Sequence, residues 1–347
     1  MLSTRSQSAP LGRIDGPLSG RRGLLDNRAR RGNTIFMMAL CGCLLISVAD
    51  TSNAQDAGAR PEVIESEGDR FPIRITYYPA PEEEHPSGLE NAPVIILLHG
   101  EGGSRLIWDK SSAPQGGQPF AEVLNEKMGY AVVTVDLRKH GESIADGVTA
   151  KVDLNDYGRM AQGDLMGVKN FLVAEHEAKK LNVRKLGIIA SDVTAPVALA
   201  FAELDWKKLP YLDGPGGAPG TPRGQDVRAI VLLSPVTNIG RLNGTRSATF
   251  LRKPQFGIAF LIMSGTRDSM DRNQARSLYQ VVSGIKANEG RVELLRPNTN
   301  ARGTDLLGTQ PPAVEVPILE FLKTHVKELD DEWETRKSRY DREPDDE

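Results

Sequence analysis

A short turn in the middle of the chain, Ala190-Ser191-Asp192-Val193-Thr194, contains the side chains best suited to nucleophilic chemistry. The segment before it, KLGIIA (185–190), is typical of a buried strand, and the segment after it, TAPVALAFAEL (194–204), is typical of a helix. A hydroxyl or carboxylate in such a strand–turn–helix unit can act as a nucleophile when a general base lies within hydrogen-bond distance. The chemistry therefore depends on which residues the rest of the chain brings to this turn.

Two further polar residues follow later strand-like segments. Asp268 comes just after QFGIAFLIMSG (255–265), with Asp271 as a weaker acidic candidate, and Arg302 comes after RVELLRP (291–297). Continuous apolar runs alternate with helical segments along the chain, ending in a helix at 312–329, and such runs are typical of parallel strands that are covered on both faces. The pattern predicts an α/β protein with a mostly parallel twisted sheet and helices on both faces. Its other strands are expected at 71–80, at 93–100, in 129–143, where the strand ends in a polar loop, and at 226–236.

These motifs, in this order, resemble the α/β-hydrolase superfamily, particularly its esterase and dienelactone-hydrolase-like members. The resemblance covers roughly residues 70–327 and rests on the turn described above and on three loops: Leu98-His99-Gly100-Glu101-Gly102-Gly103, Asp136 to Ser143, and Gly265-Thr266-Arg267-Asp268. It implies the α/β-hydrolase fold with a minimal cap. It also implies oxyanion-hole donors near Gly100, Glu101 and Gly102 and at Val193, the residue after the nucleophile position.

The residues that flank the turn assign its tip to Asp192. A nucleophile elbow needs small residues two positions before and two positions after its tip, because strand and helix approach closely there. With Asp192 at the tip these residues are Ala190 and Thr194, whereas with Ser191 they would be the bulky Ile189 and Val193. Aspartate acts as nucleophile in some enzymes of this fold, so the assignment alone leaves catalysis open.

The residue expected to be the catalytic base is missing from its usual place. In this family the chain order is nucleophile, acid, histidine, and Asp268 matches the acid. The loop where the histidine should lie instead contains Arg302-Gly303. Arginine stays protonated and cannot accept a proton. Among the five histidines of the chain, His99 and His140 lie before the turn and are the candidates for a rewired base.

Arginine is well suited to pair with carboxylates. Asp192 and Asp268 would repel each other in a closed site, and a guanidinium between them offsets that repulsion. We therefore expect an Asp192–Arg302–Asp268 ion network where the family has a serine–histidine–aspartate triad. His99 is expected mainly to hold its loop. Asp136, His140 and Ser143 are expected to fix a strand-end loop by local hydrogen bonds.

The N-terminal 54 residues read as a targeting segment. Seven arginines and two acidic residues precede the apolar run IFMMALCGCLLISVA (35–49), which Ser52-Asn53-Ala54 follows. This pattern is typical of a signal peptide, and the run is short for a membrane span, which needs about 20 apolar residues. An uncleaved anchor, or a lipidated Cys43 in the lipobox-like Leu40-Cys41-Gly42-Cys43, remains an alternative. Residues 55–70 are expected to be a flexible leader, 71–329 the hydrolase-like domain, and 330–347 a charged disordered tail.

The composition of the chain bears on which binding partners to expect. The net charge of −3 gives no support for nucleic-acid binding, and no His, Asp or Glu cluster has the spacing of a metal site. No cofactor is expected, and the sequence does not define an oligomeric state.

The interpretation that follows is an exported protein, in the periplasm, in the cell envelope or secreted, with an impaired triad and a binding function. The ligand would be a small molecule or another envelope component, and the membrane would be touched only through the N-terminal segment. The alternative is an active hydrolase with Asp192 as nucleophile. A weaker third hypothesis is an interaction protein that uses the tail or the Gly/Pro-rich loop 213–225.

Overall fold

An eight-stranded sheet forms the centre of the computed structural model, which describes residues 58–109, 117–144, 151–308 and 311–342. The strand order is β1-β2-β4-β3-β5-β6-β9-β10; β1 and β2 pair antiparallel, as do β2 and β4, and the other neighbours are parallel. The strands are β1 (Arg60–Glu65), β2 (Pro72–Tyr78), β3 (Val94–Leu98), β4 (Ala131–Asp136), β5 (Leu186–Ser191), β6 (Val227–Leu233), β9 (Ala259–Met263) and β10 (Val292–Leu295). A small hairpin, β7 (Asn238–Ile239) and β8 (Leu242–Asn243), lies outside this sheet.

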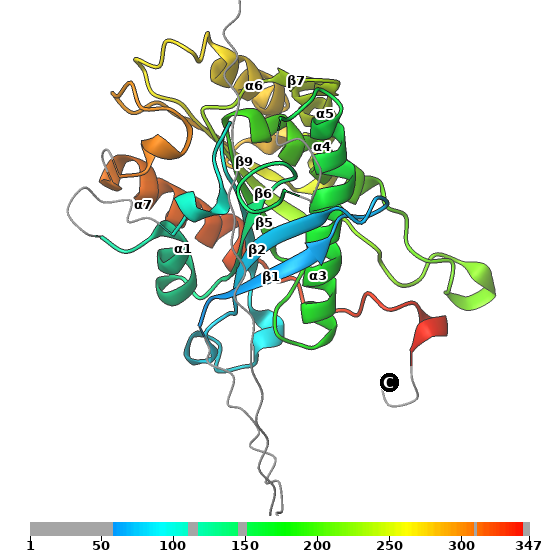
Figure 1. Cartoon of the computed structure of the whole chain (residues 1–347). Coiled ribbons are helices and arrows are strands. Elements are labelled where there is room, and N and C mark those ends of the chain that lie inside the picture. Colours follow the sequence, from blue (N-terminus) through cyan, green and yellow to red (C-terminus); the bar gives the residue numbers. More distant parts are fainter. Residues whose placement is uncertain (1–57, 110–116, 145–150, 309–310, 343–347) are drawn as a thin grey trace, which may run out of the picture. The chain divides into compact units, whose positions relative to one another are not determined.

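Helices cover both faces of the sheet (Figure 1). One face packs against α3 (Leu165–Glu177), α4 (Ala195–Lys207), α5 (Gly244–Leu251) and α6 (Gln274–Ser283), and the other against α1 (Phe120–Glu122) and α7 (Pro311–Leu322). A short α2 (Asp156–Arg159) precedes α3. Side chains alternate between the two cores along each strand, as the pleat requires: in β3, Ile96 lies in the first core and Ile95 in the second.

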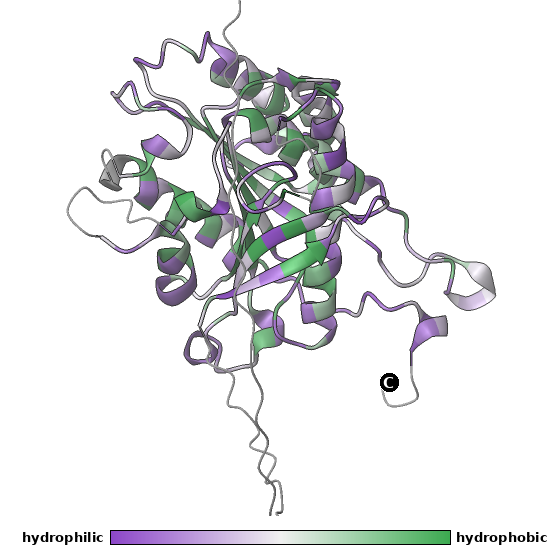
Figure 2. Cartoon of the chain, in the orientation of Figure 1, coloured by the Kyte–Doolittle hydropathy of each residue, from purple (hydrophilic) through white to green (hydrophobic). Residues whose placement is uncertain are grey.

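The apolar strands predicted from the sequence therefore form the predicted sheet. Figure 2 shows hydrophobic residues concentrated in the central strands and on the helix faces that meet them, with hydrophilic residues on the outer faces. The mostly parallel α/β architecture is confirmed. No helix of the described ranges is long and apolar enough to cross a bilayer. The targeting segment 1–54 lies outside the described residues.

The expected flexible leader differs from the structure. Residues 60–65 form β1 and pair with β2 from Arg60↔Tyr77 to Glu65↔Pro72. The polar sequence RPEVIE suits an edge strand because backbone hydrogen bonds, and not a buried apolar run, hold it in place. Ile64 packs against the first core, and the Arg60 guanidinium lies 4.9 Å from the centre of the Tyr77 ring.

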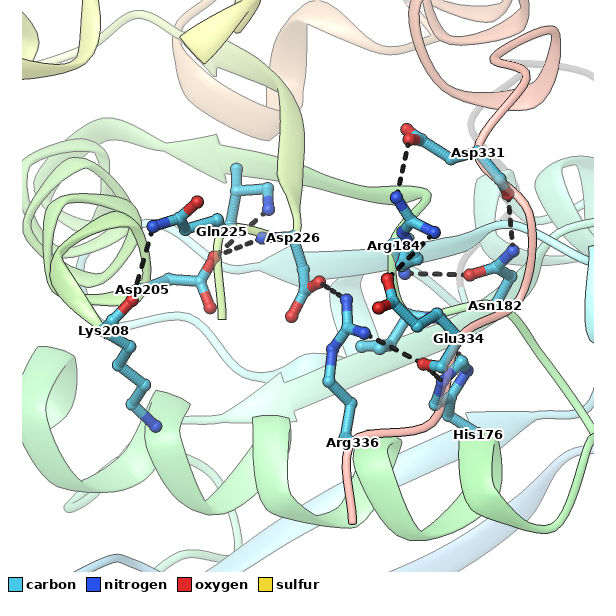
Figure 3. A network of polar contacts seen from close by, with 12 residues as sticks. His176, Asn182, Arg184, Asp205, Lys208, Gln225, Asp226, Asp331, Glu334 and Arg336 are labelled. Carbon is cyan, nitrogen blue, oxygen red and sulfur yellow. Dashed lines mark hydrogen bonds and ion pairs between the residues drawn. The ribbon is translucent and has the colours of Figure 1, made fainter. Parts of the chain in front are cut away.

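The expectation of a disordered tail is wrong for residues 331–342, which we call the C-terminal segment. Trp333 stacks on His176 with ring centres 4.9 Å apart, and its indole N–H donates to the His176 carbonyl at 2.9 Å. Arg336 is only 6% exposed and donates to Asp226 at 2.5 Å (Figure 3). The mixed charge that suggested a solvated end instead supplies partners for buried groups of the domain.

Those buried groups form a compact ion network. Lys169 of α3 donates to Asp205 at 2.8 Å and to Asp226 at 2.6 Å, and all three side chains are at most 2% exposed. Arg336 supplies the second positive charge, so two cations balance two carboxylates. Buried charges are tolerated when each is paired in this way.

We predict that Arg336→Ala lowers the free energy of unfolding by about 2–4 kcal/mol, because it removes one of two partners of the buried Asp226. Chemical denaturation of the purified protein measures this change. Arg339→Ala is the matched control, since Arg339 is exposed and uses only its backbone N–H to reach Asp213. Equal stability of the two variants would contradict a structural role for the Arg336 side chain.

Candidate functional site at the strand–helix turn

Asp192 occupies the tip of the turn between β5 and α4. Ser191 is the last residue of β5, and Asp192 has a φ of 54°, in the left-handed region that non-glycine residues seldom adopt. A strand that turns sharply into a helix imposes such a conformation on its tip residue and exposes the side chain. The Asp192 carbonyl accepts a hydrogen bond from the Val236 N–H at 3.3 Å, which ties the turn to the loop after β6.

Arg302 bridges Asp192 and Asp268. Its Nη1 donates to Asp268 Oδ2 at 3.0 Å, and its Nη2 donates to Asp192 Oδ1. The side chains of Arg302 and Asp192 are 23% and 17% exposed, whereas that of Asp268 is 3% exposed. Burial by itself would lower the pKa of Arg302, but the hydrogen bonds and charges of the two aspartates raise it above its ordinary value. The guanidinium is therefore a permanent cation at this place.

The order of the strands explains why these three residues meet. Asp268 follows β9 and Arg302 follows β10. The strand order on this side of the sheet is β5-β6-β9-β10 and all four strands are parallel, so the loops after them lie at the same edge. The loops after β9 and β10 are joined by backbone hydrogen bonds, from Thr266 to Pro297 at 2.9 Å and from Arg267 to Thr299 at 3.0 Å. The weaker acidic candidate, Asp271, lies apart from this group: it accepts from the Ala275 N–H at 2.9 Å and from Arg296 at 3.4 Å.

Ser191 lies directly beneath the network and its hydroxyl is unpaired. The residue is fully buried, and its Oγ has no hydrogen-bond partner among the described residues. Gly303, with a φ of 56°, comes so close that a Cβ there would lie 2.5 Å from that Oγ; a Cβ on Gly100 would lie 3.3 Å from it. Glycine is therefore required at 303. The Ser191 hydroxyl proton therefore has no acceptor among the residues that the structure describes.

His99 and His140 hold loops and are not bonded to Asp192 in the described structure. His99 is fully buried; its Nδ1 pairs with the Gly100 carbonyl at 2.8 Å and its Nε2 with the Leu137 N–H at 3.4 Å. Both bonds suit a neutral ring, and burial lowers the pKa of His99 to about 4. The His140 ring lies 4.6 Å from that of His99 and pairs with the Arg138 carbonyl at 3.0 Å.

The other three histidines contact residues elsewhere. His85 pairs with the Gly129 carbonyl at 2.6 Å, His176 stacks on Trp333, and His325 lies against the ring of Phe321 with centres 4.7 Å apart.

A buried ion pair that the sequence analysis missed holds the loop of the expected oxyanion hole. Arg105, 5% exposed, donates to Asp136 through its backbone N–H at 2.5 Å and through its guanidinium. Asp136 also accepts from the Glu142 N–H at 2.9 Å, and the Ser143 hydroxyl donates to the Asp136 carbonyl at 2.7 Å. The local bonds expected of Asp136, His140 and Ser143 are present. The full burial of Asp136 at the end of β4 requires a cation nearby, and that burial is known only from the structure.

The network opens into a cleft of about 530 Å³. Its walls are the glycine-rich loop after β3, the turn after β5 and the loop after β10; they include Gly100, Glu101, Gly102, Gly103, Ser191, Asp192, Arg302, Gly303 and Asp305. The expected donors Gly100, Glu101 and Gly102 thus line the cleft, while the side chain of Val193 is buried behind the turn. In the described ranges no three His, Cys, Asp or Glu side chains are grouped so as to hold a metal ion.

We predict that Arg302→Ala lowers the free energy of unfolding by about 1–3 kcal/mol and the melting temperature with it, because Asp192 and Asp268 lose the charge between them. Differential scanning calorimetry measures the shift. Arg276→Ala, at an exposed position of α6, is the matched control. Adding Asp192→Asn to Arg302→Ala should recover part of the loss, and no recovery would show that carboxylate repulsion is not the cause.

No family model matches the sequence, and no curated protein matches it. Solved structures do match. An esterase from Pyrococcus furiosus is 16% identical, with a TM-score of 0.53 over 77% of this chain and 91% of that one. An acylaminoacyl peptidase from Pyrococcus horikoshii is 13% identical, with a TM-score of 0.52 over 80% of this chain but 44% of that longer one. At identities this low, a structural match is evidence for the architecture and not for the activity. The two matches, together with the strand order, show that the chain has the α/β-hydrolase fold.

Proposed function

We propose that the protein is exported and binds a ligand in the cleft at the strand–helix turn, with triad positions that do not catalyse hydrolysis. The observation that carries the proposal is the bridge from Arg302 to Asp192 and Asp268. It places a permanent cation where a hydrolase of this fold needs a base, and it engages the carboxylate that would have to attack.

The chemistry of an aspartate nucleophile supports the same conclusion. An ester formed on Asp192 would have to be broken by a water molecule that a base activates. Arg302 cannot accept that proton. His99 already uses both ring nitrogens in hydrogen bonds, and its surroundings disfavour the protonated ring.

The dimensions and lining of the cleft fit a small polar ligand. Its volume of about 530 Å³ is in the usual range for small-molecule sites, roughly 300–1,000 Å³. Glu101, Asp192 and Asp305 bring three carboxylates to the lining against the one guanidinium of Arg302, and the unpaired Ser191 hydroxyl lies at its base. These groups favour a neutral or cationic ligand with hydrogen-bonding groups over an anionic one.

We predict that the protein neither reacts with a serine-directed fluorophosphonate nor hydrolyses nitrophenyl esters above the rate of heat-denatured protein. Asp192→Ala should leave both results unchanged, because no catalysis depends on that carboxylate. Gel fluorescence and absorbance assays measure the two activities. A covalent mass adduct on Asp192 during incubation with esters, epoxides or haloalkanes would overturn the proposal and establish the alternative, an active hydrolase with a rewired site.

A positive control for these assays comes from the chain itself. The double variant Asp192→Ser/Arg302→His recreates the order serine, Asp268, histidine on the same loops. Label or ester turnover in this variant, but not in the natural protein, would show that the cleft admits the probes and that the two replacements account for the inactivity.

Export rests on the basic and apolar segments that precede Gln55. We predict that intact-mass and N-terminal peptide analysis of protein from a bacterial envelope fraction finds a chain that begins at Gln55. A chain that begins at a lipid-modified Cys43 would instead support the lipoprotein alternative. Recovery of uncleaved protein only from the cytosol would contradict export.

A further inference from the structure

A second cavity, of about 340 Å³, lies between α3, the loop after α4 and the C-terminal segment. It shares no lining residue with the cleft at the turn. Four of its lining side chains are basic and one is acidic; the lining is Glu67, Lys169, Asn170, Val173, Lys208, Tyr211, Arg223 and Arg336. No part of the proposed cleft function uses this cavity.

The inner wall of the cavity is electrically balanced. Lys169 and Arg336 face Asp205 and Asp226 in the buried ion network described above, so two positive charges meet two negative ones. Figure 3 shows the Arg336 guanidinium directed at Asp226. One donor is left over: the buried Nε of Arg336 has no acceptor among the described residues. Because its two carboxylates are balanced by its two cations, the network has no carboxylate left to neutralise the other cations of the cavity.

The outer wall carries two cations without counter-ions. Lys208 and Arg223 form no ion pair, and their charged groups no hydrogen bond, within the described ranges; Figure 3 shows the Lys208 amine extending away from the buried carboxylates. Arg223 is held over the Tyr211 ring, 4.7 Å from its centre, which keeps the guanidinium edge free to donate. The one acidic residue of the lining, Glu67, accepts from the neutral Asn170 amide at 3.2 Å and keeps its negative charge, so the cavity and the carboxylates behind it carry one net positive charge.

The outer wall is held in place by the C-terminal segment. Asp213, in the loop that carries Tyr211 and Arg223, accepts from the Thr221 N–H at 2.7 Å and from the Arg339 N–H at 2.7 Å. Arg342 donates to the Thr221 hydroxyl at 2.8 Å. The Gly/Pro-rich loop, which has no core of its own, is thereby fixed at one side of a cationic cavity.

We propose that this cavity is a binding site for a phosphate-class anion, held chiefly by Lys208 and Arg223. A guanidinium presents paired N–H donors that match phosphate oxygens, and an ammonium adds a point charge. Leu209 and Leu212 adjoin the lining residues Lys208 and Tyr211 in the chain, and they are 75% and 68% exposed, so apolar side chains lie near the basic ones. The guanidinium and ammonium donors suit a free phosphate and the phosphate of a lipid headgroup alike, and the exposed leucines would favour the lipid. Experiment distinguishes the two.

Titration calorimetry of the full-length protein with inorganic phosphate, at constant ionic strength, tests the site. We expect saturable binding in the millimolar range or tighter, which Lys208→Gln/Arg223→Gln weakens by about tenfold or more. Neither residue has an ionic partner, and Arg223→Gln removes only an exposed contact with the Tyr211 ring, so the variant should stay folded with at most a small drop in unfolding temperature when phosphate is absent. Arg276→Gln is the control for loss of a positive charge elsewhere and should bind phosphate normally.

Co-sedimentation with vesicles separates the two sources. Binding to vesicles that contain phosphatidylglycerol but not to pure phosphatidylcholine, if lost in the double variant and competed by phosphate, assigns a lipid headgroup. Phosphate binding without such vesicle binding assigns a free anion. The N-terminal apolar run is common to both proteins, so their difference reports on the cavity. Undiminished binding by the double variant, or no binding of either ligand by the natural protein, overturns the proposal.

Discussion

The bridge from Arg302 to Asp192 and Asp268 is the interaction on which the site at the strand–helix turn depends. Parallel strands bring their carboxyl ends to one edge of a sheet, so residues after β5, β9 and β10 have to meet there. When two of those residues are aspartates, either the third is a cation or one of the two carboxylates becomes protonated. A cation at Arg302 satisfies that requirement, and a guanidinium at this position donates hydrogen bonds and does not accept a proton.

The residues of this site were predictable because the fold orders them along the chain. Small neighbours placed Asp192 at the tip of the turn, and chain order pointed to Asp268 and Arg302, which the structure brings together. Arg105 was not predictable in the same way. Its partner Asp136 lies on another element, no spacing rule joins the two, and only the burial of the carboxylate, known from the structure, requires a cation.

The C-terminal segment was misjudged for a related reason. A run of mixed charge normally remains solvated, and the sequence around Arg336 contains no apolar periodicity. The interactions that dock it are single long-range pairings, with Asp226, His176 and Asp213, which are far away in the chain. Pairings of this kind leave no local pattern, whereas the strands and helices of the core do. Sequence reasoning therefore recovered most of the sheet and its helices and missed the edge strand β1 and the docked C-terminal segment.

Lys169 and Arg302 each bridge two aspartates, and the exposure of their side chains separates their roles. Lys169 and its carboxylates are at most 2% exposed and lie among packed helices and strands, so their charges are balanced within the buried network that also includes Arg336. Arg302 and Asp192 are 23% and 17% exposed at the base of a cleft, so a ligand can reach them. The turn at Asp192 also keeps a positive φ, which costs on the order of 1 kcal/mol or more for a non-glycine residue. The sharp change from strand to helix accounts for the strained turn, so the opening beside Arg302 and Asp192 is the feature that supports the proposed ligand binding at this site.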